Sequence, residues 1–65
     1  MLHINGKVIE YEDSMKLNAL LEFLEVSNQP CAVEVNNTLV PHTDRDNYTL
    51  NEGDNIEIVT LVGGG

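Results

Sequence analysis

Residues 50–65 read LNEGDNIEIVTLVGGG, and this stretch sets the architecture of the whole chain. It opens on a turn sequence, NEGD, in which Asn, Gly and Asp favour reversal of the backbone. Residues 56–62 follow as the longest β-branched and apolar run, which predicts the central strand of a sheet. Three glycines then end the chain. We therefore expect a folded domain over residues 1–62 and a flexible C-terminal glycine tail over residues 63–65.

The start of the chain predicts a β-hairpin. A short strand of alternating apolar and polar residues comes first, as expected for a strand with one buried face. Asn5-Gly6 is the strongest short signal for a hairpin turn, because both turn positions need positive φ. Residues 7–11 then form the returning strand, with Ile9 and Tyr11 on its core face.

One helix is predicted over residues 14–24. Asp13 and Ser14 are the candidates for its N-cap. Ser14 and its neighbours also resemble the attachment triplet of acyl carrier proteins, but helix capping explains them better in a strand-rich chain. The apolar side chains recur at the spacing of one helix face. They are Leu17, Leu20, Leu21 and Leu24.

Short strands and turns make up the rest. Residues 32–36 alternate again, Asn36-Asn37 can supply a turn, and the strand resumes briefly at residues 39–40. Residues 42–47 are polar and predict a surface loop. One amphipathic helix must cover the apolar face of one sheet, so the sequence predicts an α+β domain with two layers around one core.

The last strand presents two different faces. If Ile58 faces the helix, alternation turns Glu57 and Val59 outward. Leu61 then joins Val59 on the outer face. Together with Val62 these apolar residues are candidates for a docking patch beside the tail. Ordinary scattered exposure of apolar side chains is the alternative interpretation.

Size and charge argue against several functions. A chain of 65 residues makes one domain with little room for a catalytic cleft, which favours a carrier or binding role over an enzyme.

The formal net charge of the chain is −8. The basic residues Lys7, Lys16 and Arg45 are scattered, so we expect no nucleic-acid binding. An acidic surface favours partners with basic surfaces, or simply keeps the chain soluble. We expect a monomer when the protein is free.

The remaining side chains predict no bound metal or cofactor. His3 and His42 lack metal-ligand spacing. The single cysteine, Cys31, cannot form an internal disulfide, and we interpret it as a small, partly buried apolar residue. The sequence has no signal segment and no apolar run of membrane-spanning length. These features predict a cytoplasmic protein that does not bind membranes.

The glycine tail suggests a specific chemistry. Glycine has no side chain, so Gly63 and Gly64 could thread through a narrow channel and deliver the carboxylate of Gly65. A carboxylate is a poor acyl donor, but joining it to AMP creates a good leaving group that a sulfur or nitrogen nucleophile can displace. A frayed end is the alternative for such a tail taken alone.

The whole pattern resembles the ubiquitin-like β-grasp family, and within it the ThiS sulfur carriers of thiamine biosynthesis. One departure is that His42 follows the Val-Pro pair, where family members often carry a basic residue. The resemblance covers essentially all of the chain. It rests on Asn5-Gly6, the leucine stripe of the helix, Val33-Glu34-Val35-Asn36, Leu39-Val40-Pro41, the stretch from Leu50 to Val59, and Val62-Gly63-Gly64-Gly65.

The resemblance implies a ubiquitin-like β-grasp fold of the α+β class. This is a mixed sheet of four to five strands, with the first and last strands parallel and adjacent and one helix packed on one face. It also implies a cycle in which a ThiF-like adenylyltransferase adenylates Gly65, consuming ATP and Mg²⁺. A sulfur-donating enzyme then supplies sulfur for a thiocarboxylate, and a ThiG-like thiazole synthase takes the sulfur into the thiazole ring.

Two other roles fit the same features. The chain could carry sulfur for another pathway, as the small subunit of molybdopterin synthase does, or it could be a ubiquitin-like modifier or interaction domain. In each carrier role the chain has no catalytic residue and acts as a co-substrate of partner enzymes.

Overall fold

The computed structural model describes residues 1–60, and the predicted domain boundary after residue 62 lies outside this part. The elements follow one another in the order expected from the sequence. They are β1 (Leu2–Ile4), β2 (Lys7–Ile9), α1 (Leu17–Phe23), β3 (Cys31–Val35), β4 (Thr38–Leu39), the 3₁₀ helix η1 (His42–Asp44) and β5 (Asn55–Thr60).

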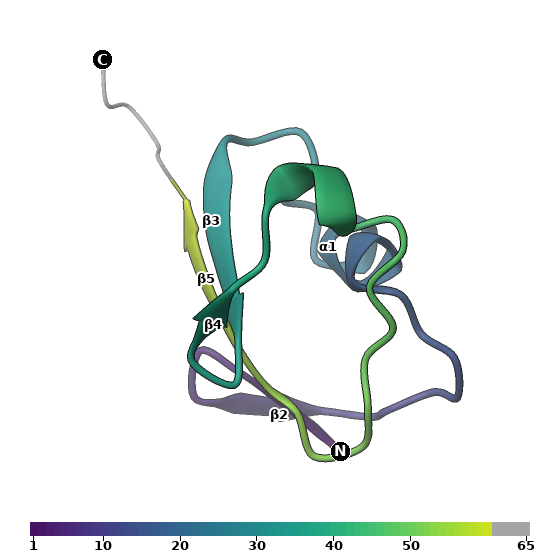
Figure 1. Cartoon of the computed structure of the whole chain (residues 1–65). Coiled ribbons are helices and arrows are strands. Elements are labelled where there is room, and N and C mark those ends of the chain that lie inside the picture. Colours follow the sequence, from purple (N-terminus) through teal and green to yellow (C-terminus); the bar gives the residue numbers. More distant parts are fainter. Residues whose placement is uncertain (61–65) are drawn as a thin grey trace.

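The strands form one mixed sheet of five strands in the order β2-β1-β5-β3-β4. β5 is central and runs parallel to β1, and the other pairs are antiparallel. Helix α1 lies on one side of the sheet (Figure 1). The predicted β-grasp architecture is therefore confirmed, including the adjacent parallel pair of the first and last strands.

Two tight turns close the two hairpins. Asn5 and Gly6 have φ of 48° and 85°, and Asn36 and Asn37 have φ of 52° and 70°. Positive φ at both central positions is the conformation that matches the twist of a hairpin, and Asn and Gly adopt it at low cost. Both turn predictions are confirmed.

The core lies between α1 and the inner face of the sheet. Leu17, Leu20 and Leu21 are buried as the helical spacing predicted, and Leu24 is partly buried. Their partners come from the three strands β1, β3 and β5 and from the loops after β4 and before β5. These partners are Leu2, Ile4, Val33, Val35, Val40, Leu50 and Ile56.

The predicted start of the helix was wrong. The helix begins at Leu17 with Lys16 as its N-cap, and no side chain caps it. Ser14 lies in a turn before it with φ of 63°. The backbone N–H of Leu17 donates to the Tyr48 carbonyl at 2.8 Å, and that of Asn18 donates to the Arg45 carbonyl at 3.2 Å. Because a distant loop satisfies these donors, no capping side chain is needed.

Residues 42–47 lie at the surface as predicted, except for Arg45. The segment contains η1, and Arg45 is only 8% exposed. Arg45 Nη2 donates to the Cys31 carbonyl at 2.7 Å, and Nη1 lies 3.5 Å from Cys31 Sγ and 3.4 Å from His42 Nδ1. The loop is therefore fastened to the start of β3, and its arginine does not project from the surface.

Strand boundaries differ slightly from the predictions. The returning strand β2 ends at Ile9. Tyr11 still packs on the core, and its hydroxyl donates to the Leu50 carbonyl at 3.1 Å. The central strand begins at Asn55, one residue earlier than predicted.

Replacement of Leu20 by alanine should lower the free energy of unfolding by about 2–5 kcal/mol, because it opens a cavity in a fully buried site. Phe23→Ala on the same helix is the control, since Phe23 is 71% exposed and its loss should cost no more than about 0.5 kcal/mol. Urea unfolding followed by circular dichroism measures both. Equal losses for the two variants would contradict the assignment of the buried face.

Candidate functional site

The candidate site is the C-terminal half of β5, from which the glycine tail continues. β3 pairs with β5 along five residues, from Val35↔Ile56 to Cys31↔Thr60. On the other side β1 pairs with it only at His3↔Asn55 and Ile4↔Ile56. Backbone pairing to β3 therefore continues as far as Thr60, while pairing to β1 stops earlier.

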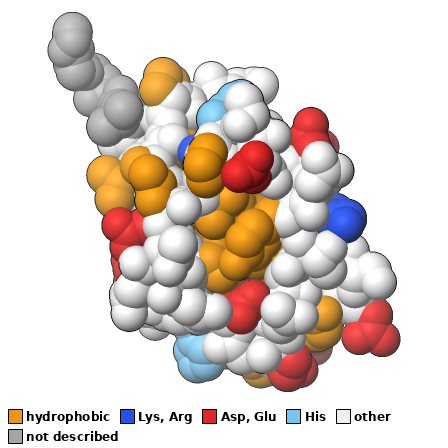
Figure 2. All heavy atoms as spheres, in the orientation of Figure 1, with side chains coloured by type: hydrophobic (Ala, Val, Ile, Leu, Met, Phe, Trp, Pro, Cys, Tyr) orange, Lys and Arg blue, Asp and Glu red, His pale blue; other side chains and the backbone are white. Residues whose placement is uncertain are grey.

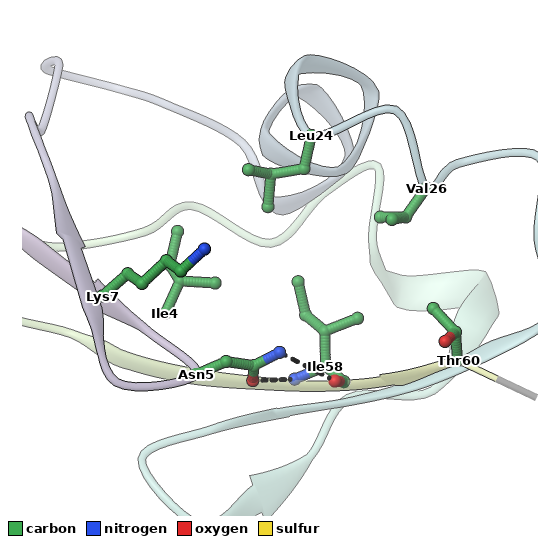
Figure 3. Close-up of a pocket in the computed structure, with 7 residues that line it drawn as sticks. All are labelled: Ile4, Asn5, Lys7, Leu24, Val26, Ile58 and Thr60. Carbon is green, nitrogen blue, oxygen red and sulfur yellow. Dashed lines mark hydrogen bonds between the residues drawn. The ribbon is translucent and has the colours of Figure 1, made fainter.

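The side chain of Asn5 extends the pairing where β1 ends. Its Nδ2 donates to the Ile58 carbonyl at 3.0 Å, and its Oδ1 accepts from the Ile58 N–H at 2.8 Å (Figure 3). The amide thus takes the place of a backbone peptide group in the ladder. Nothing in the local sequence pattern predicted this contact, because Asn5 was interpreted only as a turn residue.

A second network fixes the start of β5. Asp54 is 7% exposed, and its carboxylate accepts from Asn36 Nδ2 at 3.0 Å and from the Asn51 N–H at 2.8 Å. Asn36 Oδ1 in turn accepts from the Asn55 N–H at 3.0 Å. Gly53, with φ of 87°, allows the preceding turn. The Gly-Asp pair before β5 is therefore a structural anchor for the strand.

The outer face of β5 carries the described part of the predicted docking patch. Ile56 is buried, whereas Glu57 and Val59 are exposed, as alternation predicted. Val59 is 59% exposed. In Figure 2 hydrophobic side chains gather at the upper left of the described surface, with an acidic side chain just below them. The other predicted site residues, Leu61, Val62, Gly63, Gly64 and Gly65, lie outside the described residues.

The inner face of β5 is also partly open. A cavity of about 280 Å³ lies between the end of α1 and the sheet (Figure 3). Its walls are mostly aliphatic, with polar groups at the rim. The lining residues are Ile4, Asn5, Lys7, Leu24, Val26, Ile58 and Thr60. The end of β5 is thus accessible to a partner from both faces of the sheet.

Residues 1–60 contain neither a cluster of metal ligands nor a membrane-spanning helix. No three side chains of His, Cys, Asp or Glu in this part lie together so that they could hold a metal ion. No helix in the same part is long and apolar enough to cross a membrane. Cys31 is partly buried, as predicted.

Comparison with known proteins agrees with this geometry. The sequence model of the ThiS family matches residues 2–65. The chain belongs to the ThiS family. Its fold is similar to the crystal structure of the thiamine biosynthesis protein ThiS from Geobacter metallireducens, with a TM-score of 0.78 and 28% identity, covering 98% of this chain and 97% of that one. The ThiS resemblance and the β-grasp fold inferred from the sequence are both confirmed.

Two curated relatives extend the ThiS comparison. The uncharacterized protein ycf40 of Porphyra purpurea is 34% identical over 64 residues, which cover 98% of this chain and 90% of the relative. A thiazole synthase of Paramagnetospirillum magneticum is 41% identical over 64 residues, which cover 98% of this chain but 20% of that protein.

Replacing Asn5 by glycine tests its role at β5. Glycine keeps the positive φ of the turn but removes both hydrogen bonds to Ile58, so the free energy of unfolding should fall by about 1–3 kcal/mol. The amide proton of Ile58 should also exchange faster with solvent in an NMR hydrogen-exchange measurement. Asn37→Gly, in the other hairpin turn, is the matched control. Unchanged exchange at Ile58 would show that Asn5 acts only in its turn.

Proposed function

We propose that this chain is a sulfur carrier for formation of the thiazole ring of thiamine. Its C-terminal Gly65 is adenylated, converted to a thiocarboxylate, and used as the sulfur donor. The chain contributes the acyl group and the folded domain that presents it, and partner enzymes contribute the catalytic groups. We place this activity in the cytoplasm.

The family match that extends through Gly65 carries this proposal. Two comparisons favour the thiamine pathway over other sulfur-carrier pathways. The similar Geobacter structure is of a thiamine biosynthesis protein, and a segment similar to this chain makes up 20% of a thiazole synthase. The geometry of β5 is consistent with a carrier, because the strand is fastened at both ends of its described length.

The proposed chemistry has three steps. An oxygen of the Gly65 carboxylate attacks the α-phosphorus of ATP, and pyrophosphate leaves. A sulfur nucleophile then attacks the acyl carbon, and the bond to AMP breaks. If the sulfur arrives as a persulfide, a thiol must afterwards reduce the resulting S–S bond to leave the thiocarboxylate. The thiocarboxylate sulfur then bonds to an electrophilic carbon of the thiazole precursor on the synthase. Its bond to the acyl carbon breaks as an oxygen nucleophile, ultimately water, takes its place and restores the Gly65 carboxylate.

The proposed partners follow from these steps. They are a ThiF-like adenylyltransferase, which consumes ATP and Mg²⁺, a sulfur-donating enzyme, and a ThiG-like thiazole synthase. We propose that the adenylyltransferase docks on the outer face of β5 through Val59, Leu61 and Val62. Gly63 and Gly64 form the narrow segment that enters its active site.

Adding one glycine after Gly65 should abolish activation, because the carboxylate would then be displaced by one residue from the reacting phosphorus. The wild-type chain, incubated with a ThiF-like adenylyltransferase, ATP, Mg²⁺ and a sulfur donor, should gain the mass of one sulfur-for-oxygen exchange. A chain with one glycine added before Met1 has the same mass as the extended variant and serves as the control.

Intact-mass spectrometry distinguishes the outcomes of this experiment. Sulfur exchange in the control but not in the extended variant supports the carrier proposal. Equal exchange in both chains would contradict it. Conjugates to lysine side chains in place of the thiocarboxylate would favour a protein modifier.

A further inference from the structure

The register of β3 and β5 places two carboxylates directly opposite each other. Glu34 on β3 pairs with Glu57 on β5, and both side chains are exposed on the outer face of the sheet. Like charges at directly opposite positions destabilise a sheet. Neither carboxylate has an ion-pair partner among residues 1–60. The register therefore places two like charges side by side on the exposed face, with no ion-pair partner among the described residues.

Apolar side chains flank this acidic pair. Leu39 on β4 lies opposite Glu34, and Val59 lies two residues beyond Glu57 on the same face. Leu39 and Val59 are each 59% exposed. Ala32, opposite Val59, is also exposed. We call these five residues the outer patch: Ala32, Glu34, Leu39, Glu57 and Val59.

The three basic side chains of the protein lie elsewhere. Lys7 lines the cavity on the helix side of the sheet (Figure 3). Lys16 Nζ donates to Thr49 Oγ1 at 2.7 Å, and Arg45 is buried against Cys31. The positive charge that would complement the outer patch must therefore come from another molecule.

We infer that the outer patch binds an arginine side chain of the activating adenylyltransferase. This inference rests on the proposed function and names the chemistry by which the partner recognises the carrier. A guanidinium has five N–H donors in a planar fork, so it can bond two neighbouring carboxylates at once. Its weakly hydrated plane and aliphatic stem can pack on Leu39 and Val59. A lysine ammonium fits less well, because it is a strongly hydrated point charge.

The position of the patch also suits this role. Val59 adjoins the last described residue of β5, Thr60, from which the chain continues to Gly65. A partner held at Glu57 and Val59 would sit beside the segment that it must activate. The net charge of −8 would speed the approach of a basic surface, and the outer patch would then fix its orientation.

Charge reversal at one member of the pair tests the inference. Glu57→Lys creates an opposite-charge pair with Glu34, so the free chain should melt about 2–5 °C higher at low salt. The same change should weaken binding to a ThiF-like adenylyltransferase by at least about tenfold, because the arginine now meets a cation. Glu22→Lys is the matched control, since Glu22 is exposed on α1 and the change in net charge is identical.

Isothermal titration calorimetry measures the binding, and thermal unfolding measures the stability. Weaker binding by a more stable Glu57→Lys chain, with near wild-type binding by Glu22→Lys, supports the inference. Equal affinity of the two variants would overturn it. The carrier proposal would survive that result, because it is tested separately by the mass of the C-terminus. Absence of any binding by the wild-type chain would contradict both.

Discussion

The pairing of β5 between β1 and β3 is the constraint on which the rest of the structure depends. β5 joins two hairpins that would otherwise share no backbone hydrogen bonds, since β1 and β2 lie on one side of it and β3 and β4 on the other. Its inner face supplies Ile56 to the core beneath α1. Because the strand is central, it has no free edge along most of its length. A small domain thereby holds its last strand firmly although its core is limited.

The side-chain contacts along β5 fix both of its ends. Asp54 and Asn36 anchor the start of the strand, and Asn5 replaces β1 at Ile58. These contacts come from three turns that are far apart in the sequence. The end of the strand is thus fixed in position while both faces near Thr60 stay accessible. This combination suits the proposed carrier role, in which partner enzymes must dock beside the end of β5.

Features encoded by neighbouring residues could be predicted from the sequence. The leucine stripe of α1, the two positive-φ turns and the alternating faces of β5 depend on local spacing and local backbone preference. The start of α1 could not be predicted in this way, because carbonyl groups of the loop at Arg45 and Tyr48 satisfy its N–H groups. The burial of Arg45 was missed for the same reason, since its partner Cys31 lies on β3, far from the loop of Arg45 in the sequence. The opposition of Glu34 and Glu57 requires the strand register, which the pattern of apolar residues does not specify residue by residue.

We propose above all that the C-terminal carboxylate of Gly65 carries the sulfur atom, as a thiocarboxylate. The most direct measurement is C-terminal peptide mass spectrometry of the chain isolated from its own cells grown without thiamine. We expect a population of chains in which sulfur replaces one oxygen of the Gly65 carboxylate, and we expect that population to fall when thiazole is supplied. An unmodified carboxylate under both conditions, or Gly65 joined to lysine side chains, would contradict it.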